Sequence, residues 1–249
     1  MGGNALSSCV YCGTTGDITA DHVPPECLFE PPLPNNLITV PACRRCNQRF
    51  GRDDEYFKTA LVFRWDTDTH PVAQARRESA MRAVAREQAV GFRRLFTDTL
   101  QAAPIILRSG LYIGEGGRFV ADIERIRSVV RRIVRGLHYS KLGIALPISQ
   151  EIMVLEDETL EQFTPDIRMA MLRSLAPVLR GEPEQMGNDV FTYFWRSQGP
   201  HSSEWFMAFY SRVMFFGATA PKEDPQAMPN ATQQATGAPA VPTAERQRR

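Results

Sequence analysis

Two short cysteine motifs, Cys9-Val-Tyr-Cys12 and Cys43-Arg-Arg-Cys46, decide how the first part of this 249-residue chain folds. In each motif two residues separate the cysteines, and 30 residues lie between the two motifs. Four thiolates in this double spacing are typical of a closed tetrahedral zinc site, which is structural because no coordination position stays open. The fifth cysteine, Cys27, belongs to neither motif and is expected to be a small buried residue.

Polar side chains suited to phosphodiester hydrolysis lie between and beside the two motifs. Asp21 and His22 are adjacent, and Asn47 directly follows Cys46. A histidine that titrates near neutral pH can act as a general base, and carboxylate and amide oxygens suit a hard cation such as Mg²⁺. Because zinc would join the two motifs, we expect Asp21 and Asn47 to lie near each other, which makes cleavage at a single divalent cation possible.

In the order of these features, residues 9 to about 60 resemble the HNH endonuclease family, whose ββα-metal motif packs a short hairpin against a helix around one catalytic cation. The resemblance implies that Asp21 and Asn47 bind this cation, Mg²⁺ or Mn²⁺, and that His22 is the general base. It also implies that Asn36 braces the loop and orients His22. Many members of the family carry a structural Zn²⁺ on four cysteines, here Cys9, Cys12, Cys43 and Cys46.

The sequence departs from the family pattern at three places. Asn47 stands where many members have histidine, Gly51 stands where some have a further histidine, and two Pro-Pro pairs stiffen the connection from His22 to Asn36. The alternative is a zinc-binding module that binds nucleic acid or a protein without cleaving it. Double-stranded DNA is the expected substrate, and a ribonuclease of the same fold is a further alternative, because the sequence does not separate DNA from RNA.

Arginines cluster around and after the second cysteine motif, and the guanidinium group binds phosphate in a bidentate manner. We therefore expect phosphate contacts from Arg44, Arg45, Arg49 and Arg52. The chain has a net charge of +1, but residues 71–140 carry 13 arginines against 6 Asp/Glu. This basic block is either a further electrostatic footprint for phosphates or a set of solvated helix faces.

The whole chain is predicted to have an α+β fold in three parts. Residues 1–65 form the HNH-like zinc module, residues 66–219 form a helical basic segment and an α+β domain of unknown role, and residues 220–249 form a disordered tail. A protein partner or a second copy of the chain would bind through residues 66–219. Apolar periodicity and turn residues predict helices starting at Asp53 and covering 71–100, 122–140 and 165–176, a hairpin at 105–121 with its turn at 114–117, and strands at 151–155, 190–196 and 205–217.

The cellular location is also predicted from the sequence. The chain has no run of about 18 apolar residues, so no membrane-spanning helix is expected. The first residues lack the basic and apolar regions of a signal peptide. Together with cysteines spaced for metal binding, these features predict a cytoplasmic protein.

Overall fold

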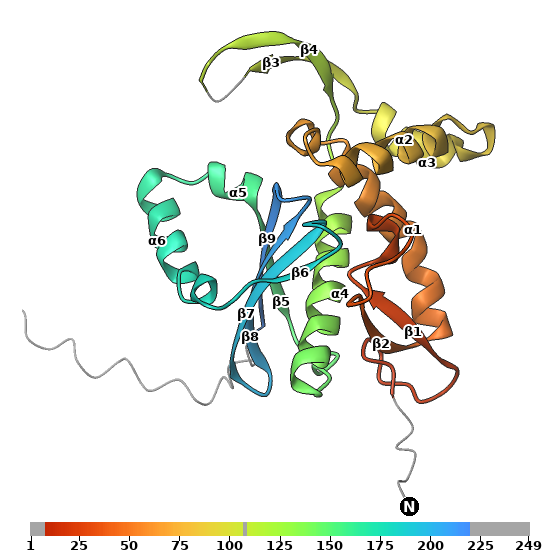
Figure 1. The fold of residues 1–249 in the computed structure, drawn as a ribbon, viewed down its shortest axis with the longest axis vertical. Coiled ribbons are helices and arrows are strands. Elements are labelled where there is room, and N and C mark those ends of the chain that lie inside the picture. Colours follow the sequence, from red (N-terminus) through yellow and green to blue (C-terminus); the bar gives the residue numbers. More distant parts are fainter. Residues whose placement is uncertain (1–7, 107–108, 220–249) are drawn as a thin grey trace, which may run out of the picture.

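The computed structural model describes residues 8–106 and 109–219, and the disordered tail predicted for 220–249 lies outside these ranges. Helices and strands are both present, so the predicted α+β class is confirmed (Figure 1). The helices are α1 Arg44–Val62, α2 Pro71–Ala85, α3 Val90–Thr97, α4 Ile123–Leu142, α5 Asp157–Glu161 and α6 Pro165–Leu175. The strands are β1 Ile18–Val23, β2 Ile38–Cys43, β3 Gln101–Ile106, β4 Tyr112–Arg118, β5 Ile152–Glu156, β6 Glu184–Met186, β7 Phe191–Gly199, β8 Ser202–Phe209 and β9 Val213–Thr219. Within these ranges, no helix has both the length and the apolar character needed to cross a bilayer.

The first two strands and the first helix form a ββα unit. β1 pairs antiparallel with β2, with Asp21 opposite Val40, and α1 starts directly after β2. Successive side chains on a strand point to opposite faces, so Asp21 and His22 leave β1 on opposite sides. Thr19 lies on the same face of β1 as Asp21, and its hydroxyl accepts a hydrogen bond from Asn47 of α1. Asp21 therefore lies on the face of β1 that faces α1.

The start of α1 differs from the prediction. The helix begins at Arg44, with Cys43 as its N-cap residue, rather than at Asp53. The acidic residues 53–55 therefore lie inside the helix, where they pair with basic side chains instead of capping it. An acidic run resembles a helix start, but here the second cysteine motif spans the end of β2 and the first helical turn and so sets an earlier start.

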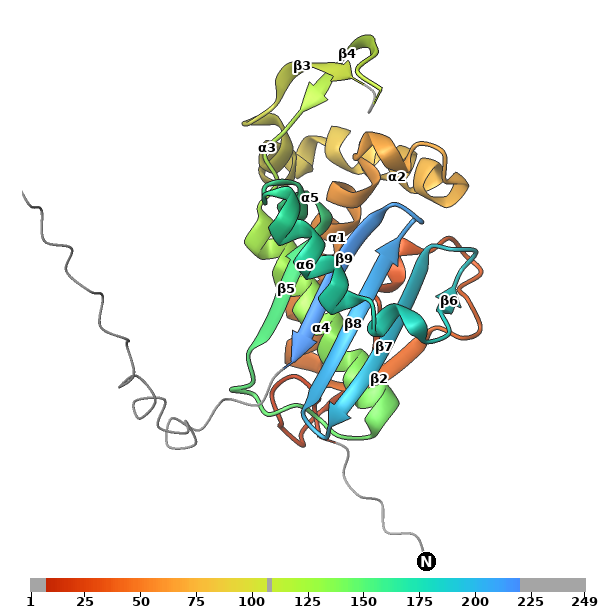
Figure 2. The same cartoon turned by 90° about the vertical axis from the view of Figure 1, so that its left-hand side faces the viewer.

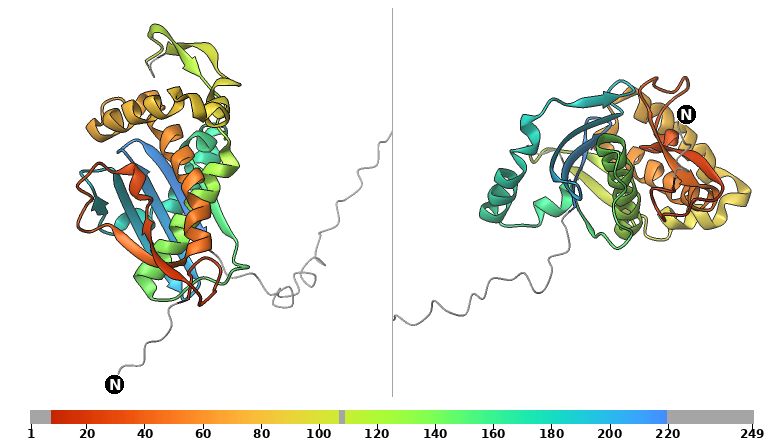
Figure 3. Two further views of the ribbon diagram at one scale, coloured as in Figure 1. Left: turned by 90° about the vertical axis from the view of Figure 1, so that its right-hand side faces the viewer. Right: turned by 90° about the horizontal axis from the view of Figure 1, so that it is seen from below.

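The central element of the fold is α4. It contacts α1, β1 and β2 on one side and β5 and β9 on the other, so it lies between the ββα unit and a five-stranded sheet (Figures 1 and 3). The approach to β1 is close, since a Cβ on Gly136 would lie 2.5 Å from Cγ2 of Val23. One apolar core runs from Val23 through Val134 to Trp205. Residues on both sides of the boundary predicted at 65/66 thus share this core.

The five-stranded sheet is antiparallel, in the order β5-β9-β8-β7-β6. Its aromatic residues Tyr193, Trp205 and Phe209 are fully buried, and Trp195 stacks on Trp205 with ring centroids 5.5 Å apart. α4 covers one face of the sheet, and the segment with α5 and α6 lies across the other (Figures 1 and 2). The strands predicted at 151–155, 190–196 and 205–217 are confirmed as β5, β7 and the β8–β9 pair.

Two local predictions between residues 71 and 121 are corrected. The predicted hairpin is present as β3 and β4, but β4 runs through residues 114–117 and the connection lies between Ile106 and Tyr112. Side chains fill the space beside two of these glycines: a Cβ would lie 2.9 Å from Cδ1 of Ile105 on Gly116, and 2.9 Å from Cδ1 of Leu100 on Gly117. The helix predicted at 71–100 is divided into α2 and α3, and this break lets Phe96 stack on Tyr56 in the core.

A buried histidine in α4 makes the stability of the fold depend on pH. His138 is fully buried, with Nδ1 2.9 Å from Ser203 Oγ and Nε2 2.9 Å from the carbonyl oxygen of Pro200. Burial lowers the pKa of His138 from its ordinary value of 6.5. Below that pH the unfolded chain takes up a proton that the folded protein resists. We therefore expect the free energy of unfolding to fall below pH 6.5 by at most about 1.4 kcal/mol per pH unit from this group.

Urea unfolding of the wild type and of His138→Gln, each at about pH 8 and about pH 5.5, tests this expectation. Glutamine cannot gain a proton, so the variant should lose less stability than the wild type over this interval. Other acid-sensitive groups act equally in both proteins. Equal losses in the two proteins would contradict the role given to His138.

Candidate metal centre and nuclease site

Four cysteines come together at one end of the ββα unit. Cys9 and Cys12 lie in the turn before β1, Cys43 ends β2, and Cys46 lies in the first turn of α1. The four sulfur atoms lie within 4.8 Å of one another, and those of Cys12 and Cys43 are 3.6 Å apart. A tetrahedral zinc ion with Zn–S bonds of about 2.3 Å needs sulfur–sulfur distances of about 3.8 Å. The cluster can therefore hold a metal ion such as zinc, as the cysteine spacing predicted.

The backbone around the first cysteine motif supports this geometry. The N–H of Gly13 donates to the carbonyl of Cys9 at 2.8 Å, which closes the turn that carries both thiols. The N–H of Val10 donates to the carbonyl of Pro41 at 3.0 Å, which attaches the motif to β2. A hydrogen bond from the backbone N–H of Cys46 lowers the pKa of the Cys43 thiol to about 7. That thiol can therefore lose its proton readily to a metal ion.

Asp21, the predicted cation ligand, is buried against α1. Tyr11, which lies between the two cysteines of the first motif, donates its hydroxyl to Oδ2 of Asp21 at 2.7 Å. The Tyr11 ring meets the Phe50 ring of α1 edge-on, with centroids 5.1 Å apart. Burial, together with the charge of Asp21, raises the pKa of Tyr11, so the phenol stays protonated and remains a donor.

Asn47, the second predicted ligand, joins the start of α1 to β1. Its Nδ2 donates to Oγ1 of Thr19 at 3.2 Å and to the carbonyl of Ala20, the residue before Asp21, at 3.0 Å. These bonds use the amide nitrogen and leave the amide oxygen to act as a ligand. A carboxylate oxygen from Asp21 and an amide oxygen from Asn47 fit a hard cation, whose remaining positions would be filled by water and substrate.

His22, the predicted base, lies on the opposite face of β1 with its side chain 33% exposed. Its Nδ1 is 3.1 Å from Oε2 of Glu26, in the short 3-10 turn Glu26–Leu28 that follows the strand. A carboxylate at Nδ1 orients the ring and leaves Nε2 to accept a proton, as a general base requires. Glu26 was not among the predicted site residues, although a carboxylate four residues after a candidate base is a detectable signal.

Among the described residues, no hydrogen bond joins Asn36 to His22, the contact that the family resemblance implied. It lies in the exposed turn between β1 and β2, and its Nδ2 donates to the carbonyl of Gln185 in β6 at 2.7 Å. The carboxylate of Glu26, not the amide of Asn36, contacts the His22 ring. The five-stranded sheet packs beside this loop, and Asn36 therefore bonds to β6 and braces the loop against it.

The arginines predicted to contact nucleic acid are all exposed on α1. Arg45, Arg49 and Arg52 follow one another at spacings of four and three residues, so they share one face of the helix. Arg44 differs from them, because its Nε lies 2.9 Å from Oδ2 of Asp17. Three of the four guanidinium groups thus form a basic stripe, which we define as Arg45, Arg49 and Arg52.

The basic block of residues 71–140 is partly neutralised within the protein. In α4, Arg127 pairs with Glu124 and Glu156, and Arg125 pairs with α1. Arg135 donates to four backbone carbonyls of residues 146–150. These arginines of α4 connect elements of the fold, a use that differs from both of the predicted alternatives.

A buried ion pair next to the candidate site also escaped sequence analysis. Arg132 of α4 pairs with Asp54 of α1, and its guanidinium lies 4.2 Å from the ring centroid of Phe50. The Arg132 side chain is 7% exposed, and its Nη1 has no hydrogen-bond partner within the described part of the chain. Burial raises the pKa of Asp54 to about 6, against the attraction of Arg132. No local pattern connects two residues that are 78 positions apart.

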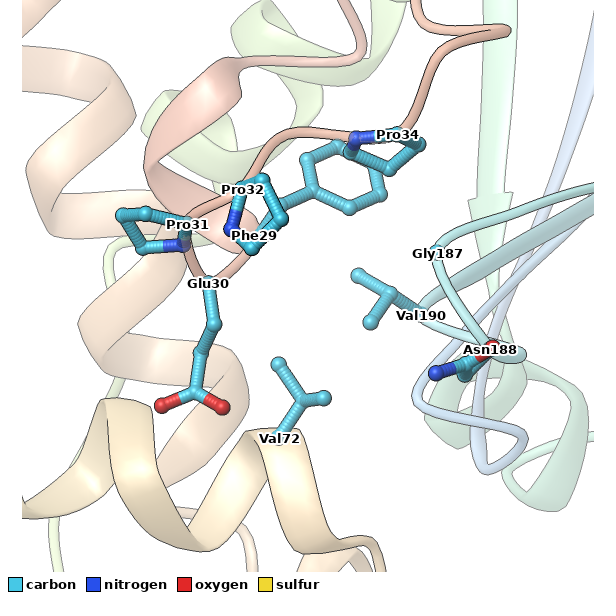
Figure 4. Close-up of a pocket in the computed structure, with 9 residues that line it drawn as sticks. All are labelled: Phe29, Glu30, Pro31, Pro32, Pro34, Val72, Gly187, Asn188 and Val190. Atoms are coloured by element: carbon cyan, nitrogen blue, oxygen red, sulfur yellow. The ribbon is translucent and has the colours of Figure 1, made fainter.

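A separate hollow of about 420 Å³ lies between the loop after β1, α2 and the turn from β6 to β7 (Figure 4). Polar and apolar groups share its wall, and Glu30 and Asn188 supply polar side chains. The lining residues are Phe29, Glu30, Pro31, Pro32, Pro34, Val72, Gly187, Asn188 and Val190. They include none of the predicted site residues, so this hollow is distinct from the candidate site.

Comparison with known proteins adds no relative from which a function could be transferred. No family model, no curated protein and no solved structure matches the chain.

Proposed function

We propose that this protein is a metal-dependent endonuclease that hydrolyses phosphodiester bonds of nucleic acid, with double-stranded DNA as its substrate. The observation that carries the proposal is the pairing of His22 with Glu26 at the end of the strand that also bears Asp21. The same strand is bonded to Asn47. A base with its orienting carboxylate and two oxygen ligands thus belong to one ββα unit. Because His22 and Asp21 leave β1 on opposite sides, the scissile phosphate would have to lie at the end of this strand, within reach of both. The proposed location is the cytoplasm, where thiols stay reduced and can bind zinc.

In the proposed reaction, Nε2 of His22 removes a proton from the attacking water. Glu26 stabilises the imidazolium that forms, because its carboxylate lies 3.1 Å from Nδ1. Asp21 and Asn47 would hold Mg²⁺ or Mn²⁺, which supplies positive charge to the scissile phosphate and the leaving oxygen. The four cysteines would hold zinc, which would keep the two ligand-bearing segments together and take no part in the chemistry.

The basic stripe of α1 supports nucleic acid as the substrate. Arg45, Arg49 and Arg52 begin within the second cysteine motif and are exposed on the helix that carries Asn47. Phosphate contacts of this kind position a nucleic acid without reading its sequence. They also make binding weaker as the salt concentration rises.

Replacing His22 with alanine is expected to slow cleavage by about 10²–10⁴-fold, the usual contribution of a general base. The measurement is conversion of supercoiled plasmid by zinc-loaded protein in Mg²⁺ or Mn²⁺. Zinc content and the far-UV circular dichroism spectrum should not change, because the His22 side chain is one-third exposed and contacts Glu26. Glu26→Gln should show a smaller loss, because the base itself remains.

Equal cleavage by the wild type and His22→Ala would contradict this mechanism. A single-stranded RNA substrate, tested in parallel, separates a deoxyribonuclease from a ribonuclease. If the RNA is cleaved faster than the plasmid DNA, RNA replaces DNA as the proposed substrate and the mechanism is unchanged.

The burial of Asp21 favours a second candidate function, a zinc module that binds nucleic acid or a protein without cleaving it. Asp21 is 7% exposed, and Tyr11 already occupies one of its oxygens. Such a module would bind DNA in a salt-dependent manner, and residues 66–219 would be free to bind a protein partner or a second copy of the chain. Binding by the wild type without cleavage in the same assay would favour this candidate.

A further inference from the structure

We propose that Tyr11 is a positioning residue that couples the zinc cluster to the cation site by orienting the carboxylate of Asp21. This inference rests on the proposed function, because it assigns Tyr11 a role toward the divalent cation that Asp21 would hold. Tyr11 does not touch the substrate or the reacting atoms in this role. It acts through one hydrogen bond, from its hydroxyl to Oδ2 of Asp21 at 2.7 Å.

The position of Tyr11 in the chain connects this hydrogen bond to the zinc cluster. Tyr11 lies inside the first cysteine motif, one residue before Cys12 and two residues after Cys9. The turn that presents both thiols therefore also presents the phenol. Metal binding by the cysteines would hold this turn against β2 and would thereby fix the position of the Tyr11 backbone.

The far end of the side chain is also held. The Tyr11 ring packs edge-on against Phe50, at an interplanar angle of 85°, and the guanidinium of Arg132 covers the ring of Phe50 at 4.2 Å. A ring held at both ends can direct its O–H toward a single acceptor. Donation to Oδ2 sets the plane of the Asp21 carboxylate and leaves Oδ1 as the oxygen for the cation.

The second cysteine motif is also connected to the cation site, in its case through Asn47. Asn47 directly follows Cys46, and its amide is bonded to the residues that precede Asp21 on β1. Each half of the zinc cluster thus supplies one residue that fixes the cation site: Tyr11 orients one ligand, and Asn47 is the other. Hydrogen-bond partners of metal ligands commonly change metal affinity by about 10–100-fold when they are removed.

The test is Mn²⁺ binding to the zinc-loaded, full-length Tyr11→Phe variant, measured by electron paramagnetic resonance of free Mn²⁺. This substitution removes one hydroxyl and keeps the ring on Phe50. We expect Mn²⁺ to bind about 10-fold more weakly than to the wild type, with the zinc content unchanged. Cleavage should recover when the Mn²⁺ concentration is raised, since the chemistry at His22 is intact.

The matched control is Tyr193→Phe. It removes a similar bond, from the Tyr193 hydroxyl to Oε2 of Glu184 at 2.8 Å, but in the five-stranded sheet. This variant should bind Mn²⁺ like the wild type. Unchanged Mn²⁺ affinity in Tyr11→Phe would overturn the coupling and leave the proposed function standing. Loss of zinc from Tyr11→Phe would overturn the coupling as well, because the Tyr11 hydroxyl would then stabilise the zinc cluster and not the cation site. A wild type that binds no Mn²⁺ would overturn both proposals.

Discussion

Replacing Cys46 with serine is expected to release the zinc and unfold the ββα unit. The sulfur atoms converge within 4.8 Å, and they join the turn before β1 to the start of α1. The buried apolar cluster around them contains little besides the cysteines and Ala42, so packing alone does not hold these segments. Structural zinc supplies about 10–16 kcal/mol of apparent free energy in small zinc modules. This amount equals the whole stability of a typical domain, about 5–15 kcal/mol.

The measurements are zinc content by elemental analysis, the midpoint of thermal unfolding and amide hydrogen exchange over residues 9–62. Because Val23 packs against α4, the loss should also lower the stability of the C-terminal part of the chain. A Cys46→Ser protein that keeps a full equivalent of zinc and an unchanged midpoint would contradict the structural role of the cluster.

Cys27→Ser is the matched control for this experiment. The Cys27 thiol lies outside the cluster and donates to the carbonyl of Asp54 at 3.5 Å. Burial raises its pKa to about 12, so it stays protonated and is a poor metal ligand. Its replacement should leave the zinc content unchanged.

The features that sequence analysis predicted correctly depend on residues close together in the chain. The spacing within each cysteine motif is local, and two such motifs are specific enough to predict that four thiols converge. α4 follows from its apolar periodicity and ends before Gly143, whose φ of +68° favours glycine. The strands of the large sheet were detectable from their aromatic and β-branched residues.

The features that sequence analysis missed depend on contacts between distant segments. Asn36 bonds to Gln185, which is 149 positions away, so no motif could show that the loop braces against β6. The early start of α1 depends on the cysteine motif that spans β2 and the helix, and this outweighs the local preference of Asp53 for a helix start. The Arg132–Asp54 pair joins α4 to α1, two helices that are far apart in the sequence.

Replacing Asp54 with leucine is expected to lower the free energy of unfolding by about 3–5 kcal/mol, because it leaves the charge of Arg132 buried without a counterion. The Arg132 side chain is 7% exposed, and its Nη1 already lacks a partner within the described residues. Urea unfolding of zinc-loaded protein measures the effect.

The double variant Asp54→Leu/Arg132→Met separates the cost of breaking this pair from its net contribution to stability. Burial, together with repulsion from Asp21 and Asp53, raises the pKa of Asp54 to about 6 despite the attraction of Arg132. Replacing both members of a buried ion pair with apolar side chains of similar volume is often neutral or stabilising, so the double variant should restore most of what Asp54→Leu loses. If the double variant is instead less stable than Asp54→Leu alone, Arg132 stabilises the fold independently of its partner, through its contact with Phe50. In that case the cation–π contact would outweigh the cost of burying the guanidinium, and the ion pair would be secondary.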